Sequence, residues 1–167
     1  MNSLVTKLAG LHDRTFALVS RLQSPFLLLV RLYWGWQLAE SGWGKLHHLD
    51  NVAEFFGTLN LPHPAQMAFA ISCLEFFGGI LFAIGLFSRL ISLVLTINMV
   101  MAYVTADREA LLSFISDPDK FSAAAPYVFL VSSLIILIFG PGKICLDYLL
   151  RRFAHLPNAA VKDSYES

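Results

Sequence analysis

Residues 65–106 read AQMAFAISCLEFFGGILFAIGLFSRLISLVLTINMVMAYVTA, and Glu75 and Arg89 are the only charged residues in this stretch of 42. A helix needs roughly 20 largely apolar residues to cross a membrane. The stretch is therefore long enough for two spans, and Arg89 separates its two halves. It predicts transmembrane helices at about residues 65–87 and 89–106, joined by a short turn.

Two further apolar stretches flank this pair. Residues 25–46 follow Ser24 and begin with Pro25. This combination suits a helix start, because Ser can cap the helix N-terminus and Pro is well accommodated in the first turn. Residues 123–140 contain no charge and end at Gly140-Pro141-Gly142. The sequence therefore predicts an all-α fold: an integral membrane four-helix bundle over residues 25–150, with cytoplasmic segments at residues 1–24 and 151–167.

The composition agrees with a membrane protein and excludes several other classes. Hydrophobic residues make up 56% of the chain and charged residues 14%, whereas a soluble domain carries about 25% charged residues. Zero net charge without a basic patch argues against nucleic-acid binding. Two Cys residues argue against a disulfide-stapled secreted domain. Residues 1–24 have no apolar core of the kind found in a secretory signal.

Lys and Arg are distributed unevenly between the two sides of the predicted bundle. One side carries Lys7, Arg14, Arg21, Arg89, Lys143, Arg151, Arg152 and Lys162, and the other carries Lys45, Arg108 and Lys120. Cytoplasmic loops hold the excess of positive charge, so both termini are predicted to be cytoplasmic. Between the first two spans, apolar residues recur at helical spacing from Asp50, a candidate cap, to Leu59, which predicts a short helix in the outer interface.

Polar residues inside the spans are the candidate functional residues, because charge in a bilayer is costly and is usually functional. Arg31 lies close enough to Pro25 for its long side chain to reach the cytoplasmic headgroups. Glu75 lies in the middle of its span and must be protonated, hydrogen-bonded or paired. Gln37 and Asn98 fall at a similar depth, so the candidate site is a polar cluster of Glu75 with these two residues. An Arg31–Glu75 ion pair is the alternative and needs a favourable helix tilt.

Small residues indicate which helix faces pack. Gly35, Ala39 and Gly42 follow Arg31 in the first span, and Gly78 and Gly79 follow Glu75 in the second. Small residues let helix backbones approach closely in lipid. Glu75 is therefore predicted to lie on a packing face, either as a hydrogen-bonding link between helices or as a proton, cation or quinone-headgroup site.

Other chemistry finds little support. No His lies within a span, which excludes an axial haem ligand there. His47, His48 and His63 gather on the outer side without the i, i+4 spacing of a helical metal site, so no metal ligands are predicted. Cys73 and Cys145 are too far apart along the predicted fold for a disulfide. No catalytic residue is assigned.

Aromatic residues crowd the first span. Trp43, with Tyr103 of the third span, suits an outer aromatic belt, whereas Trp34 and Trp36 are predicted to be buried or to face lipid. A stacking platform for a ring-shaped ligand is the alternative interpretation of these tryptophans.

Several motifs resemble those of the DoxX family of small four-helix membrane proteins. They are Arg31 with Gly35 and then Gly44-Lys45, Leu61-Pro62, the segment from Glu75 through Gly78-Gly79 to Leu81, Gly85-Leu86 with Arg89, and the closing segment from Gly140-Pro141-Gly142 to Asp147. The resemblance covers roughly residues 25–150, and Cys145 stands where the family often has Ser. It marks as motif positions Lys45, Gly78, Gly79, Arg89, Gly140, Pro141, Gly142 and Asp147.

Members of that family include the membrane subunit of an archaeal thiosulfate:quinone oxidoreductase and a membrane partner of superoxide dismutase and a sulfurtransferase in mycobacteria. The resemblance implies a multi-pass protein of the bacterial inner membrane that serves as a non-catalytic subunit or anchor of a quinone-linked redox or sulfur-stress complex. Its partners would be the lipid bilayer and other membrane or soluble redox subunits, and the one cofactor suggested is a quinone. Two alternatives stay open: a structural or assembly protein, and a small proton-coupled transporter that uses Glu75.

Overall fold

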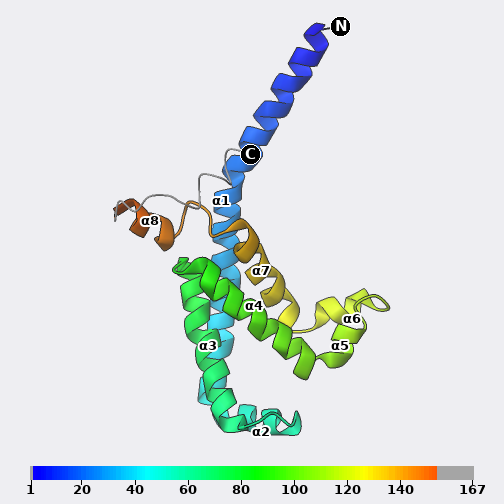
Figure 1. Cartoon of the computed structure of the whole chain (residues 1–167), viewed down its shortest axis with the longest axis vertical. Coiled ribbons are helices and arrows are strands. Elements are labelled where there is room, and N and C mark those ends of the chain that lie inside the picture. Colours follow the sequence, from blue (N-terminus) through cyan, green and yellow to red (C-terminus); the bar gives the residue numbers. More distant parts are fainter. Residues whose placement is uncertain (1, 154–167) are drawn as a thin grey trace.

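The computed structural model of the chain describes the backbone of residues 2–153 and the side chains of residues 22–153. All regular structure in this part of the chain is helical, which confirms the prediction of an all-α protein (Figure 1). Of the predicted cytoplasmic tail, residues 154–167 lie outside the described residues. The helices are α1 (Asn2–His47), α2 (Leu49–Thr58), α3 (Pro64–Ile84), α4 (Ser88–Thr105), α5 (Arg108–Leu112), α6 (Pro118–Ala123), α7 (Pro126–Phe139) and α8 (Leu146–Phe153).

The four long helices form two antiparallel pairs. α1 packs along α3 and α4 packs along α7, with smaller contacts between α3 and α4 and between α1 and α7 (Figure 1). Two ends of the structure can be named for later use. At the Gly85 end, the α3–α4 turn meets the segment after α7, because the Asp147 N–H donates to the carbonyl oxygen of Gly85 at 3.0 Å. At the His47 end, α1 passes into α2, which packs on α3.

Helix α1 is much longer than the predicted span. It runs from Asn2 through Pro25 to His47, so the prediction that a helix begins at Ser24-Pro25 is wrong. Leu, Ala, Arg and Lys together make up ten of residues 2–24, and these residues favour a helix enough for it to continue past the N–H that Pro25 lacks. Ser24 has another use, since its hydroxyl accepts a hydrogen bond from the backbone N–H of Lys143 at 3.2 Å.

The connections contain short helices. The helix predicted between the first two spans is present as α2, but Asp50 does not cap it. His48 occupies the N-cap position, and Asp50 lies in the first turn. There its negative charge interacts favourably with the positive end of the helix dipole. In the connection between α4 and α7, the Asp117 carboxylate caps α6 by accepting a hydrogen bond from the backbone N–H of Lys120 at 3.1 Å.

Small residues bring α1 and α3 together, as their positions predict. A Cβ atom added to Gly79 would lie 2.6 Å from the backbone nitrogen of Ala39 and 2.7 Å from the carbonyl oxygen of Gly35. On the other side of α3, a Cβ at Gly78 would lie 3.2 Å from the Leu95 side chain of α4. The two adjacent glycines thus let α3 approach both of its neighbours closely.

The distribution of polarity is the reverse of that in a soluble protein. Among residues 22–153, seven polar or charged residues are buried, namely Arg31, Ser72, Glu75, Ser88, Ser92, Ser132 and Ser133. Large apolar side chains are exposed along the outer faces of the helices, among them Trp36, Phe69, Phe77, Ile97 and Phe139. A soluble protein rarely exposes so much contiguous apolar surface, whereas lipid favours it.

Within the described part of the chain, two helices are long and apolar enough to cross a membrane. They are α3 and α4, and they correspond to the spans predicted at residues 65–87 and 89–106. Helix α7 is apolar but shorter than the predicted span, because it begins only at Pro126. Its 14 residues extend about 21 Å at 1.5 Å per residue.

Candidate functional site

The buried carboxylate of Glu75 on α3 is paired with Lys45 of α1. The Lys45 Nζ lies 2.7 Å from Oε1 and 2.6 Å from Oε2 of Glu75, and the hydroxyl of Ser41 donates to Oε2 at 3.3 Å. The Glu75 side chain is 6% exposed and that of Lys45 is 35% exposed. The pair therefore has one buried member and one that reaches the edge of the protein.

Helix geometry explains why Lys45 reaches Glu75 and Arg31 does not. Leu38, Ser41 and Lys45 follow one another at spacings of three and four residues, which places them on one side of α1. Helical side chains lean toward the N-terminus of their own helix. Because α1 and α3 are antiparallel, Lys45 and Glu75 lean toward each other, whereas Arg31 leans away toward the Gly85 end.

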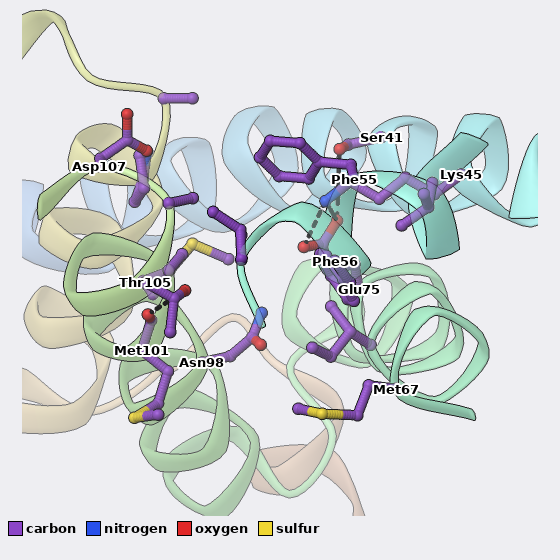
Figure 2. A pocket seen from close by; sticks show the side chains of 18 of the residues that line it. Ser41, Lys45, Phe55, Phe56, Met67, Glu75, Asn98, Met101, Thr105 and Asp107 are labelled. Atoms are coloured by element: carbon purple, nitrogen blue, oxygen red, sulfur yellow. Dashed lines mark hydrogen bonds and ion pairs between the residues drawn. The ribbon is translucent and has the colours of Figure 1, made fainter. Parts of the chain in front are cut away.

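The ion pair forms part of the wall of a cavity of about 560 Å³ near the His47 end (Figure 2). The wall is mostly apolar and includes Phe55 and Phe56 of α2 and Phe129 of α7. Its polar members are Ser41, Lys45, Asn51, Glu75, Asn98, Thr105 and Asp107. Figure 2 shows Ser41, Lys45, Glu75, Asn98, Thr105 and Asp107 around a common space, on different segments of the chain.

The structure separates the residues of the predicted polar cluster. Asn98 lines the same cavity as Glu75, but Gln37 is not among the lining residues. Glu75 takes its hydrogen bonds from Lys45 and Ser41, neither of which the predicted cluster includes. Lys45 was predicted only to lie on the outer side with Arg108 and Lys120, and no contact with Glu75 was predicted for it.

Arg31 lies in a second polar region, at the Gly85 end. Its side chain is completely buried, and Nη2 donates to the carbonyl oxygen of Ile144. Its Nε and Nη1 atoms have no hydrogen-bond partner among the described residues. The prediction that Arg31 reaches the headgroups is therefore wrong, because the segment after α7 covers the guanidinium.

Gly85 makes room for this arrangement. A Cβ at this position would lie 1.8 Å from Arg31 Nη1 and 2.7 Å from the Cβ of Cys145. Gly85 also has a φ of 73°, in the left-handed region that side chains disfavour. Both observations account for a glycine at the turn between α3 and α4.

Asp147 fastens the closing segment to the start of α4. Its carboxylate accepts from the backbone N–H groups of Phe87 and Ser88, each at 2.8 Å, and from the Ser88 hydroxyl at 2.9 Å. A carboxylate at a helix N-terminus accepts hydrogen bonds from the free N–H groups, and its negative charge interacts favourably with the helix dipole. Arg89 is exposed on the same turn, and its guanidinium lies beside Gly140. These motif positions therefore have a structural use.

Comparison with known proteins assigns the family. Residues 26–108 match the family model described as DoxX. Through this segment, the chain belongs to the DoxX family. It is also 27% identical over 120 residues to a Bacillus subtilis (strain 168) protein named "Putative oxidoreductase CatD", with 72% of this chain and 83% of that protein covered. No solved structure matches the chain.

The DoxX match confirms the resemblance drawn from the motifs and identifies a helical membrane protein. The matched segment contains Lys45 and Glu75, together with α2, α3 and α4, which supply most of the cavity wall. Helix α7 and the segment from Gly140 to Asp147 lie beyond it.

One aromatic assignment made above for this DoxX chain is wrong, whereas Cys73 and Cys145 are both free, as predicted. Tyr103 is 1% exposed and donates to the Phe121 carbonyl oxygen at 2.8 Å, so it anchors α6 instead of belonging to an aromatic belt. Cys145 is buried, and its thiol donates to the carbonyl oxygen of Gly142 at 3.2 Å. Burial raises the pKa of the Cys145 thiol, which keeps it protonated.

The signal that could have identified the Lys45–Glu75 pair is present in the sequence. Gly35, Ala39 and Gly42 define the face of α1 that packs on α3, and Lys45 continues that face three residues after Gly42. Extending the small-residue pattern by one turn would have placed Lys45 within reach of Glu75.

Proposed function

We propose that this DoxX protein is a non-catalytic membrane subunit of a quinone-linked redox or sulfur-stress complex, and that its cavity holds the quinone headgroup. The observation that carries the proposal is the cavity of about 560 Å³ with a Lys45–Glu75 pair on an otherwise mostly apolar wall. Sites for small molecules are typically cavities of about 300–1,000 Å³, largely apolar, with a few polar groups that orient the ligand.

The lining groups suit a quinone ring. A quinone presents two carbonyl acceptors on a flat apolar ring, and it therefore needs donors and an apolar or aromatic wall. Lys45 has three N–H donors, and its contacts with Oε1 and Oε2 of Glu75 leave one for a ligand. The Asn98 amide supplies a further donor, and Phe55 and Phe56 supply ring faces.

The chain itself contributes binding, while the electrons and the two protons come from elsewhere. Reduction of a quinone takes up two electrons and two protons. A partner oxidoreductase supplies the electrons in this proposal, and the name of the Bacillus relative agrees with an oxidoreductase association. Lys45 presents an N–H donor at Nζ to the ring, and Glu75 keeps that ammonium oriented.

We also infer that α3, α4, α7 and the part of α1 from about residue 25 cross the bacterial inner membrane as a four-helix bundle. The exposed apolar faces support this membrane domain of residues 25–150. Arg89, Lys143, Arg151 and Arg152 lie at or near the Gly85 end, and positive charge favours the cytoplasmic side. The Gly85 end and both termini would then be cytoplasmic, and the cavity would lie toward the outer side.

The proposal is tested by purifying the protein from native membranes in mild detergent and measuring extracted quinone and co-purified proteins. Wild type should retain quinone and an oxidoreductase. Lys45→Met should lose at least about tenfold in quinone affinity, since a hydrogen bond to a charged group contributes roughly 1.5–3 kcal/mol.

Lys120→Met is the matched control, because Lys120 forms a more exposed ion pair with Glu109 at 3.0 Å outside the cavity. It should retain quinone at the wild-type level. A wild-type protein that carries no quinone and brings down no oxidoreductase would refute the proposal. Equal loss of quinone in both Lys variants would refute the assigned site.

A further inference from the structure

A second hollow lies on the opposite side of the α1–α3 contact from the ion pair. It is a groove of about 680 Å³ that contains Trp36, Glu40 and Trp43 of α1 and Phe76, Ile80 and Ile84 of α3. We call it the Glu40 groove. It shares no lining residue with the cavity at Lys45. The close backbone contacts at Gly42 and Gly79 separate the two.

The shape of the Glu40 groove follows from residue size. Gly35 and Ala39 form its floor on α1, and Ala83 contributes on α3. Large side chains rise on both sides, and Trp36 and Trp43 are 70% and 53% exposed. The ring centroids of Trp43 and Phe76 lie 5.2 Å apart, which closes the groove at one end.

Glu40 places a carboxylate in this apolar groove. It is exposed, and among the described side chains of residues 22–153 it has neither a hydrogen bond nor an ion pair. Its neighbour Ala39 packs against Gly79, fifteen residues along α3 from Pro64, which is about 22 Å at 1.5 Å per residue. Glu40 is therefore within the length of a helix that is able to cross a membrane.

A carboxylate in such a position needs a counter-charge or a proton, because exposing its charge to lipid is costly. No Lys or Arg lines the groove. No second acidic residue lines it either, so the oxygen ligands that a Ca²⁺ or Mg²⁺ ion requires are missing. An acyl chain would fill the space but leave the carboxylate uncompensated.

We propose that the Glu40 groove binds an amphipathic organic cation, an amine or quaternary ammonium with an apolar or aromatic body. Glu40 supplies the counter-charge. The indole rings of Trp36 and Trp43 flank the cation, and indole is the strongest cation–π partner among the side chains. The apolar body lies on Phe76, Ile80 and Ile84, which line the α3 side of the groove.

Tetraphenylphosphonium is a suitable probe, and tetraphenylborate is its counterpart of similar shape and opposite charge. Binding of each to the full chain in detergent is measured by equilibrium dialysis and by quenching of indole fluorescence. Tetraphenylphosphonium should bind saturably with a stoichiometry of one. Glu40→Gln should reduce its affinity at least about tenfold, which is the lower end of the effect expected when a contact with a charged group is lost. Tetraphenylborate should show no saturable binding.

Glu54→Gln is the matched control, since Glu54 is an exposed acid on α2 outside the groove. It should bind the cation as wild type does. Equal binding of the cation by wild type and Glu40→Gln would overturn the proposal, and so would equal binding of the borate, which would indicate a groove for apolar molecules only. The quinone content of Glu40→Gln should match that of wild type. A negative result for cation binding would therefore leave the proposed quinone site untouched, and the reverse also holds.

Discussion

Substitution of Gly42 by Ala tests the packing that positions the Lys45–Glu75 pair. A Cβ at Gly42 would lie 2.3 Å from the backbone nitrogen of Phe76 and 2.8 Å from the carbonyl carbon of Glu75, against 3.4–4 Å for ordinary contact. Both neighbours are backbone atoms of α3, so no side chain can rotate away. The helices must separate by about 1 Å, which is the shortfall between those distances.

The size of the effect follows from comparison with Gly44→Ala two residues further along α1. A Cβ at Gly44 would have no neighbour within 4 Å. Both substitutions gain the same helix propensity, about 1 kcal/mol, so this gain cancels in the difference. What remains is the cost of overpacking, typically about 1–3 kcal/mol.

The measurement is thermal unfolding of both variants in the same detergent, followed by circular dichroism. For a chain of this size, each kcal/mol lost from the free energy of unfolding lowers the unfolding temperature by about 2–4 °C. Gly42→Ala should therefore unfold roughly 2–12 °C below Gly44→Ala. It should also lose quinone. Equal unfolding temperatures, or a higher one for Gly42→Ala, would refute the close α1–α3 contact.

Two further predictions concern the Gly85 end. Asp147→Ala removes three acceptor contacts from the start of α4 and should destabilise the protein by about 1–2 kcal/mol in the same unfolding assay. Asp119→Ala, an exposed acid on α6, should have little effect, and equal losses would contradict the capping role. Because burial raises the pKa of the Cys145 thiol, less thiolate is present at a given pH. In a Cys73→Ser background, the pH profile of Cys145 alkylation by iodoacetamide should therefore be displaced to higher pH than in the unfolded chain, and a coincident or lower profile would contradict this.

The parts of the fold that could be predicted are those that depend on local composition. Helices α3 and α4 follow from the length of their apolar stretches, and Glu75 stands out as a lone charge in one of them. The α1–α3 contact follows from Gly35, Ala39 and Gly42, because small residues at helical spacing permit close approach in lipid.

The parts that could not be predicted depend on residues distant in the sequence. Arg31 is buried because Ile144, 113 residues away, provides a carbonyl acceptor and the segment around it provides cover. Tyr103 is buried for a similar reason, since α6 returns over it. The Lys45–Glu75 pair was not predicted, because Lys45 was placed only with the charges of the outer side. Its aliphatic stem extends along the helix, which brings the ammonium to Glu75.

The most direct test of the account is photoaffinity labelling of the protein in native membranes with an azido-quinone, followed by mapping of the labelled peptides. The cavity at Lys45 predicts labelling of the α2 segment that contains Phe55 and Phe56 and of the α4 segment that contains Asn98, with competition by unmodified quinone and loss in Lys45→Met. Labelling spread over the exposed apolar faces of the helices, without competition and unchanged in Lys45→Met, would contradict a quinone site in this protein.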